Sequence, residues 1–445
     1  MVKYKIKQLT IPQYIVVNYI AIILIGGILL ALPFASNAHQ WTNLLDAMFT
    51  ATSAVCVTGQ TTLNTALHWS PFGKLVIITL IEIGGIGFMT LWVVFFTQSG
   101  RRTNLRQRRV LLETLNIETM SGSIDIVKYI IKFTLAVQSL GALVLSLVFI
   151  PQFGWVKGTL YSVFHSISAF NNAGFDLFGN SLINYQANPL VMLTISVLII
   201  AGGLGFIVWR DLLTVYRNRK LMRYTKLIII GTLALLLSST LLFICFEWNN
   251  QTWQHLSPVN RVINSFFLAV TPRTAGYANV DYNFLMPGSL FLTLVLMFIG
   301  GTSGSTAGGV KVSTVIVAGL FLVNTFRGHP MTLYRRELRE ETLRRAFFIL
   351  TMGFTFILFA TLILLITEPF PHGTGIEVIL MEVVSCFSTV GLTMGITPQL
   401  SAVGKLVLIW LMFMGRCGLV TFLWSLGSHE KNWQIHYPEM NMMIG

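Results

Sequence analysis

Long apolar runs, separated by short polar joints, dominate the chain. Several of them, such as residues 11–32, reach the length of about 20 apolar residues that an α-helix needs to cross a bilayer. The pattern predicts an all-α protein that crosses a membrane many times. The first run is too long for the apolar part of a cleavable signal and no small-residue cleavage pattern follows it, so we expect the chain to keep it.

One unit of roughly 100 residues is used four times, each copy consisting of an apolar span, a short amphipathic segment ending in glycine, and a second apolar span. The middle segments align without gaps on that glycine: MFTATSAVCVTG (48–59), VFHSISAFNNAG (163–174), SFFLAVTPRTAG (265–276) and LMEVVSCFSTVG (380–391). A second glycine landmark follows after 24 to 28 residues, at Gly84 and Gly85, Gly202 and Gly203, Gly300 and Gly301, and Gly415. We therefore divide the chain into repeats at 1–100, 101–220, 221–335 and 336–428, followed by a tail at 429–445.

The middle segments are too short to cross the membrane. About 12 helical residues at 1.5 Å each cannot span a hydrocarbon core of about 30 Å, so each segment must enter the membrane and return. Irregular backbone at that depth is tolerated where it lines a water-filled cavity. The expected fold is four helix, re-entrant pore loop, helix repeats around a central pore, with eight spans.

Charge sets the orientation and excludes some functions. The 30 basic and 17 acidic residues give +13, but the basic residues cluster at the ends of apolar segments, which favours anionic headgroups over nucleic acid as their partner. They lie at the N-terminus and in the joints between repeats: Lys3, Lys5, Lys7; Arg101, Arg102, Arg106, Arg108, Arg109; Arg210, Arg217, Arg219, Lys220, Arg223, Lys226; Arg327, Arg335, Arg336, Arg339, Arg344 and Arg345. The positive-inside rule makes these joints and both termini cytoplasmic, so the repeats are parallel, unlike those of inverted-repeat transporters.

The opposite side of the membrane carries most of the acids outside the spans. They are Asp46, Asp176, Glu247, Asp281, Glu368 and Glu377. They either concentrate cations at the entrance or are merely solvated loop residues.

The sequence offers little for enzyme chemistry. The four cysteines form no CxxC pair, and no paired acids or histidine-rich cluster lies within the spans, so we expect no enzyme, bound cofactor or structural metal. A voltage-gated channel would need an arginine-rich span, and none is present.

Each re-entrant segment is a candidate for one quarter of a cation filter. A desolvated cation needs backbone oxygens, and a chain that exposes successive carbonyls needs a residue able to adopt positive φ. Main-chain oxygens of the four glycines and the two residues before each are the expected ligands: Val57, Thr58, Gly59; Asn172, Ala173, Gly174; Thr274, Ala275, Gly276; Thr389, Val390 and Gly391. The alternative is four tight turns with no ligand role.

These motifs resemble the membrane subunits of the Trk/Ktr/HKT superfamily of potassium transporters, most closely those of KtrB type, over nearly the whole chain. STVGL (388–392) is similar to the potassium-channel TVGYG, whereas CVTGQ, NNAGF and RTAGY keep only the glycine. The resemblance implies a potassium-channel-like fold and K+ transport, through a filter shorter than that of channels. Because serine at the first filter glycine accompanies sodium transport in HKT relatives, Gly59 favours potassium. A sodium or less selective monovalent cation transporter is the alternative.

The stretch from residue 289 to residue 326 differs from the other second spans. Its 38 residues would measure about 57 Å as one helix, and it contains GGTSGSTAGGVK. Glycine disfavours a helix interior by about 1 kcal/mol, and serine and threonine compete for backbone hydrogen bonds, so we expect it to unwind. The predicted gate is a polar flap beneath the filter, formed by Gly300, Gly301, Thr302, Ser303, Gly304, Ser305, Thr306, Ala307, Gly308, Gly309 and Lys311. Close glycine-mediated helix packing is the alternative, and it is the interpretation that we prefer for the other glycine landmarks.

Arg416 is a charge within the last span, at the level of the glycine landmarks. Such charges face the interior and are paired or functional. We expect Arg416 to point into the pore beneath the filter and to act as a barrier with the flap, a role that the resemblance also implies. The alternative is an ion pair with Glu82 or another acid. Arg273, which could claim Glu82 instead, is expected mainly to brace the filter.

The resemblance also implies partners. Relatives work as homodimers with one pore per subunit and dock onto a cytoplasmic ring of nucleotide-binding, KtrA-type regulatory subunits. The joint at residues 327–345 suits that ring, although positive-inside bias alone would also produce it. We expect the tail to lie in the dimer interface and the protein to reside in the plasma or inner membrane. The sequence leaves open whether Na+ stimulates transport and which nucleotide regulates it.

Overall fold

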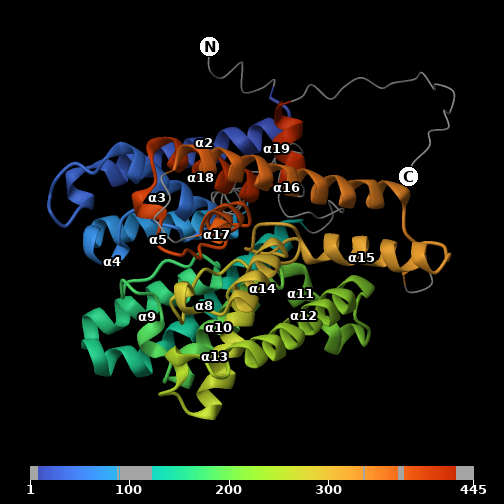
Figure 1. Ribbon diagram of the computed structural model, residues 1–445, viewed down its shortest axis with the longest axis horizontal. Coiled ribbons are helices and arrows are strands. Elements are labelled where there is room, and N and C mark those ends of the chain that lie inside the picture. The colour runs from blue at the N-terminus through green and yellow to red at the C-terminus, as the bar shows by residue number, and fades with distance from the viewer. Residues whose placement is uncertain (1–8, 88–89, 91–122, 334–335, 369–374, 427–445) are drawn as a thin grey trace.

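The computed structural model describes residues 9–87, 90, 123–333, 336–368 and 375–426 (Figure 1). Four parts of the sequence predictions fall outside these residues: the N-terminal Lys3, Lys5 and Lys7, the joint that contains Arg101 to Arg109, Arg335, and the tail at 429–445.

Four long apolar helices open the four repeats. They are α2 (Ile11–Ala31), α8 (Ser123–Phe153), α12 (Arg223–Glu247) and α16 (Glu340–Thr367), and each is long and apolar enough to cross a membrane. A capping box between Thr10 and Gln13 starts α2, and Glu340 and Glu341 occupy the first turn of α16, where carboxylates favour the helix dipole. Leucines along these helices, such as Leu147 and Leu237, stay exposed and provide the surface that acyl chains require.

A short helix follows each long one and is buried towards the centre. These pore helices are α3 (Leu44–Cys56), α9 (Trp155–Phe170), α13 (Pro258–Val270) and α17 (Ile376–Phe387). Side-chain caps define two of their starts: Asn43 accepts from the Leu45 amide at 2.9 Å, and Ser257 accepts from Asn260 at 3.3 Å. All four helices end three to six residues before their filter glycine, so each delivers that glycine to the middle of the molecule.

The second helices of the repeats are interrupted. Helix α5 (Pro71–Ile86) ends just before Gly87. Helices α10 (Pro189–Gly203) and α11 (Phe206–Asn218) meet at 95°, and α18 (Ala402–Cys417) and α19 (Leu419–Leu426) meet at 105°. In the third repeat, α14 (Pro287–Phe298) is separated from α15 (Val312–Phe326) by non-helical residues.

Three of these interruptions share one cause. Gly87, Gly205 and Gly418 each follow the glycine landmark of their repeat by three residues, and their φ angles are 88°, 87° and 83°. A helix cannot continue through such a residue, and glycine adopts this conformation without steric cost. The second span therefore turns at the same level in repeats 2 and 4, where a straight helix was the simplest expectation.

The remaining described elements are short. They are helix α4 (Thr65–His68), the short turns η1 (Pro33–Ala35), η2 (Ile183–Tyr185), η3 (Gln251–Trp253), η4 (Tyr282–Phe284) and η5 (Thr397–Gln399), and a hairpin of β1 (Thr332–Leu333) and β2 (Arg336–Glu337). The two strands pair antiparallel, with Thr332 opposite Glu337.

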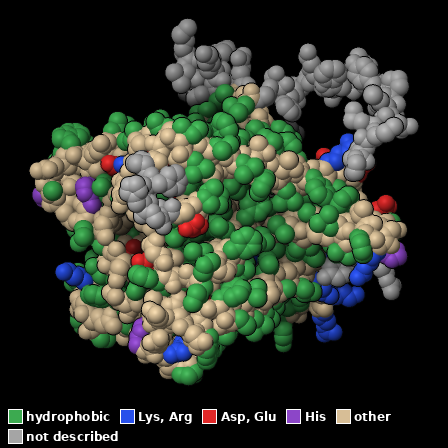
Figure 2. Space-filling model, in the orientation of Figure 1, with side chains coloured by type: hydrophobic (Ala, Val, Ile, Leu, Met, Phe, Trp, Pro, Cys, Tyr) green, Lys and Arg blue, Asp and Glu red, His purple; other side chains and the backbone are tan. Residues whose placement is uncertain are grey.

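The repeats follow one another around a central axis. The second helix of each repeat packs against the pore helix of the next: α5 on α9, α10 on α13, α14 on α17, and α18 on α3. The last of these contacts closes the circle, so the first repeat (blue) and the last (red) lie together in Figure 1, opposite the two middle repeats. Figure 2 shows hydrophobic side chains over most of the visible face, while lysines and arginines gather mainly at one end.

Candidate functional site: four re-entrant loops and an intramembrane loop

The four predicted filter segments share one backbone conformation. The residue two before each glycine adopts a left-handed conformation, with φ of 58° at Val57, 60° at Asn172, 72° at Thr274 and 51° at Thr389. The glycines follow at 91°, 68°, 75° and 95°, and the residue between has negative φ. Alternation of handedness turns successive peptide groups to the same side of the chain. Four unrelated turns would not share this alternation of φ angles.

The amides of these segments are bound by their own pore helices. In repeat 1, the Thr58 amide donates to the Ser53 carbonyl at 2.8 Å and the Gly59 amide to the Ser53 hydroxyl at 3.0 Å. Repeat 4 repeats this pair, with Val390 and Gly391 donating to Ser385 at 2.8 and 2.9 Å. The amides of Ala173 and Ala275 likewise donate to carbonyls of Ser168 and Thr271.

The carbonyls of the same segments behave differently. Within the described part of the chain, none of the twelve main-chain oxygens from the predicted filter residues accepts a hydrogen bond. The eight non-glycine residues that carry them are at most 1% exposed. Buried carbonyls normally find a partner because leaving one unpaired is costly. Carbonyl oxygens grouped in this way are the kind of ligand that a desolvated cation needs.

The filter segments touch one another in a closed ring. A Cβ added to Gly59 would overlap with the Ala173 carbonyl oxygen, and one on Gly174 would lie 2.7 Å from that of Ala275. In the same way Gly276 abuts Val390, and Gly391 abuts Thr58. Glycine is thus required at each of these positions for two reasons: the positive φ angle and the close approach of the next repeat. A side-chain contact of 3.2 Å between Asn172 and Thr274 joins repeats 2 and 3.

The non-helical segment of the third repeat, residues 299–311, lies directly against these filter segments. We call it the intramembrane loop. Its Gly308 abuts the Thr389 side chain, and a Cβ on Gly300 would lie 3.4 Å from the Thr274 methyl group. The Thr302 amide donates to the Gly203 carbonyl at 3.1 Å and the Thr306 amide to that of Gly202 at 3.3 Å. The loop is therefore held on the glycine landmark of repeat 2, below the filter.

Two cations fix the loop in this position. The Lys311 ammonium donates to the carbonyls of Ala307 at 2.6 Å and Gly308 at 3.3 Å, which closes the loop on itself. Arg416 donates to the Thr306 carbonyl and also to the carbonyls of Gly84 and Gly85, the latter at 3.3 Å. Its guanidinium thereby joins the loop to the first repeat. Together these contacts tie the loop to all four repeats.

The alternative ion pair for Arg416 is not formed. Glu82 instead accepts hydrogen bonds from the amides of Gln138 at 3.0 Å and Asn171 at 2.6 Å. Both ion pairs found within the described residues, Arg344 with Glu340 and Lys405 with Asp46, lie elsewhere. Arg416 is consequently a charge satisfied by neutral carbonyls. Arg273 does not claim Glu82 either: it is 6% exposed, and its Nε has no hydrogen-bond partner.

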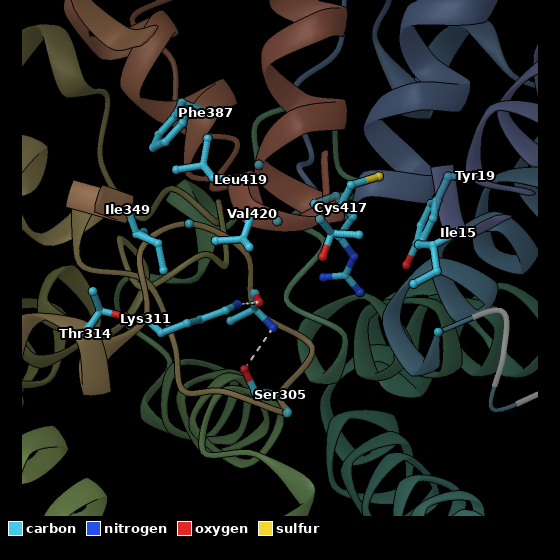
Figure 3. Close-up of a pocket in the computed structure, with 18 of the residues that line it drawn as sticks. Ile15, Tyr19, Ser305, Lys311, Thr314, Ile349, Phe387, Cys417, Leu419 and Val420 are labelled. Atoms are coloured by element: carbon cyan, nitrogen blue, oxygen red, sulfur yellow. Dashed lines mark hydrogen bonds between the residues drawn. The ribbon is translucent and has the colours of Figure 1, made fainter. Parts of the chain in front are cut away.

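A cavity of about 210 Å³ lies beside the loop (Figure 3). Its lining includes Ser305 and Lys311 of the loop, Tyr19 of α2, and Arg416 and Cys417 at the bend between α18 and α19. Figure 3 shows Ser305 and Lys311 on one side of this cavity and Tyr19 on the other. The loop and Arg416 thus form part of the wall of this cavity.

Comparison with known proteins identifies the family. The model of the cation transport protein family TrkH matches residues 5–435. The chain belongs to the TrkH family. This is a family of membrane cation transport proteins rather than of enzymes.

Individual relatives extend over the full length of this TrkH-family chain. The potassium/sodium uptake protein NtpJ of Enterococcus hirae is 46% identical over 99% of this chain and 98% of its own. The Ktr system potassium uptake protein B of Bacillus subtilis is 38% identical over 98% and 97%. The crystal structure of the potassium transporter TrkH from Vibrio parahaemolyticus aligns with a TM-score of 0.73 at 19% identity, covering 93% of this chain and 84% of that one. That alignment supports the polytopic, pore-loop fold.

Four of the acids that the sequence analysis places opposite the basic joints are engaged in local structure in this TrkH-family chain. Asp46 pairs with Lys405 at 2.8 Å, and Asp176 accepts from the amides of Phe178, Gly179 and Ser181. Two others hold the starts of second helices. Glu247 accepts from the Met286 amide at 3.0 Å, and Glu368 from the amide and the hydroxyl of Ser401 at 2.8 and 2.6 Å. These four acids therefore stabilise the connections in which they lie and are not simply solvated.

The glycine landmarks pack against the pore helices in three repeats, as the sequence predicts for them. A Cβ on Gly84, Gly202 or Gly415 would overlap with the carbonyl oxygen of Val55, Phe170 or Phe387, each four residues before the filter glycine. In the third repeat, Gly300 meets the Gly308 carbonyl of the intramembrane loop instead. The loop thus occupies the position that a pore-helix end takes in the other repeats.

Replacing Gly202 with alanine is expected to lower the thermal stability of the purified protein. The added Cβ must displace the Phe170 backbone, and overpacking of this kind costs about 1–3 kcal/mol. Gly319→Ala in α15 is the matched control, because no heavy atom lies within 4 Å of its Cβ position. Thermal unfolding in detergent measures both variants. Equal melting temperatures for Gly202→Ala and the native protein would contradict the packing role.

Sequence reasoning missed two groups of residues at this site. Ser53 and Ser385, six residues before their glycines, bind the filter amides. Serine recurs there in three of the four aligned segments, which was the available signal. The bend glycines Gly87, Gly205 and Gly418 were visible in the sequence, but nothing there distinguished them from glycines used for packing.

Proposed function

We propose that this protein is the potassium-translocating membrane subunit of a Ktr-type uptake system, in which K+ passes between the four filter segments. The observation that carries the proposal is the set of twelve buried, unpartnered carbonyl oxygens on four segments that close into a ring. Carbonyl oxygens replace the hydration shell of a cation. The glycine at all four ring positions favours K+ over Na+.

The names of the relatives support cation uptake but differ in the ion. Two Ktr system proteins B are named for potassium uptake, and NtpJ for potassium and sodium. A sodium or less selective monovalent cation transporter with the same filter is thus the second candidate, favoured by the 46% identity to NtpJ. In either case the ions are cargo, and stimulation by Na+ is part of the proposal to be tested.

The intramembrane loop and Arg416 serve as the gate in this proposal. Three features support the assignment: the loop packs against two filter segments, it contains no helix or extended strand, and an arginine fastens it to the opposite repeat. Conduction requires the loop to leave this position. Arg416 places a positive charge on the same route and raises the barrier for cations.

The proposal also covers the partners of the protein and the membrane in which it lies. The protein works as a homodimer in the plasma or inner membrane, with both termini and the joints cytoplasmic, and a ring of nucleotide-binding KtrA-type subunits moves the gate. The hairpin and the start of α16, on the cytoplasmic side in this proposal, carry exposed charges that include the surface pair Arg344 and Glu340. They offer a polar surface for such a ring.

Uptake into proteoliposomes tests the proposal. The purified full-length chain is expected to take up K+ in preference to Na+, and a K+ gradient should persist in protein-free vesicles. Uptake of both ions at similar rates would favour the second candidate. Absence of flux for either ion, with or without the regulatory subunit, would contradict both.

A further inference from the structure

A buried carboxylate lies behind the filter, outside the residues assigned so far. Glu382 in α17 is 0% exposed, and its two oxygens accept from three donors. These are the side-chain amide of Gln60 and the hydroxyls of Thr393 and Thr397, the last at 2.8 Å. The Gln60 side-chain nitrogen also lies 3.4 Å from the Thr397 hydroxyl, and the Cys386 thiol donates to the side-chain oxygen Oε1 of Gln60 at 2.5 Å.

The donors come from two filter segments. Gln60 directly follows Gly59 of repeat 1, and Thr393 stands two residues after Gly391 of repeat 4. One carboxylate therefore joins the ends of both segments. This link lies at the contact between repeats 4 and 1, where Gly391 abuts Thr58. Here the ring closes between the first and the last repeat of the chain.

The corresponding positions in the other repeats form no such link. Nine residues before the filter glycine stand Thr50, His165, Phe267 and Glu382. The Thr50 hydroxyl donates to Asp46 of its own helix at 2.9 Å, and the His165 ring accepts from the Leu177 amide of its own repeat at 3.3 Å. Phe267 has no polar atom to offer. Of the four positions, Glu382 alone binds a neighbouring repeat.

The carboxylate depends on these donors. Among the described residues no lysine, arginine or histidine forms an ion pair with Glu382. A buried carboxyl group without hydrogen bonds is strongly unfavourable, and loss of the acceptor would leave three buried donors unsatisfied. The arrangement is therefore most stable when the two segments keep their present spacing.

From this geometry we propose that Glu382 is a positioning residue of the filter. By holding the segments of repeats 1 and 4 at a fixed distance, it sets the width of the carbonyl ring and thereby the preference for K+ over Na+. This inference rests on the proposed function.

The test compares two variants of Glu382 with a matched control. Glu382→Ala removes the acceptor, and Glu382→Gln keeps the shape but turns one oxygen into a further donor. Glu368→Ala is the control, since Glu368 is also buried and binds Ser401 but makes no contact with the filter. The readout is the ratio of initial K+ to Na+ uptake in proteoliposomes, together with the KM for K+.

Glu382→Ala is expected to lower the ratio of K+ to Na+ uptake about tenfold. This is the effect of losing about one charge-assisted hydrogen bond. The change should appear as a raised KM for K+. Glu382→Gln should shift the ratio in the same direction by less, and the control should leave it unchanged. Gln60→Leu should reproduce the shift, and the double variant should be no worse than the larger single effect, because both remove the same link.

If Glu382→Ala does not fold, Thr397→Val removes one donor at little cost in volume and is expected to shift the ratio in the same direction. A native ratio in the Glu382 variants, or in Thr397→Val when only that variant folds, would overturn the inference. So would additive effects of Gln60→Leu and Glu382→Ala. Failure of the proposed function would look different, because the unaltered protein would then show no preference for K+.

Discussion

Replacing Gly59 with serine is expected to reduce the ratio of K+ to Na+ uptake by about tenfold or more. Gly59 has φ of 91°, a conformation that costs a residue with a Cβ about 1–2 kcal/mol. The new Cβ would also overlap with the Ala173 carbonyl oxygen and push it out of the ring. A strain of 1.4 kcal/mol already corresponds to about a tenfold change in an equilibrium.

Gly395→Ser separates these two effects. Gly395 has the same φ of 91°, but no heavy atom lies within 4 Å of its Cβ position. It should therefore share the backbone strain and keep the native ion preference. Initial uptake rates of both ions, measured side by side in proteoliposomes, decide the matter. If Gly59→Ser preserves the native ratio, the filter assignment is wrong.

Replacing Arg416 with alanine is expected to raise K+ flux about tenfold under conditions in which the native gate is closed. The guanidinium joins the Thr306 carbonyl of the intramembrane loop to the carbonyls of Gly84 and Gly85, and hydrogen bonds from a charged group are worth about 1.5–3 kcal/mol. Without them the loop leaves the filter more readily, and the positive charge on the route is also gone. Flux is measured without the regulatory subunit.

Arg261→Ala is the matched control for this prediction. Arg261, in the first turn of α13, also donates to three carbonyls, those of Leu256, Trp248 and Gln254, but all three lie in the connection between α12 and α13. Gly308→Ser provides an independent route to the same state, since its side chain would displace the loop from Thr389. An unchanged or reduced flux in Arg416→Ala would refute the barrier role.

Much of the fold could be predicted because the chain contains four copies of one unit. The alignment on Gly59, Gly174, Gly276 and Gly391 compares the chain with itself. It identifies the four re-entrant segments, and it shows that the second span of the third repeat differs from the other three. The break in residues 299–311 follows from the accumulation of glycine, serine and threonine. Local composition and length carried these predictions.

Features that depend on distant partners could not be predicted. Arg416 binds main-chain carbonyls, which leave no signature in the sequence, so a choice between barrier and ion pair remained open. Glu247 and Glu368 looked like loop acids in the sequence, because their amide partners Met286 and Ser401 lie 39 and 33 positions away. Glu382 gave no signal, because Gln60 lies 322 positions away.

The circular contact between neighbouring repeats has a consequence for biosynthesis. The segment that ends at Gly59 emerges early from the ribosome, yet its neighbour across the closing contact, the segment that ends at Gly391, is among the last to be made. Domains of long chains generally fold in the order of their synthesis, but here the first three repeats can only wait as an incomplete arc. A chain that terminates before its fourth repeat would lack one of the four segments, so the ring could not close.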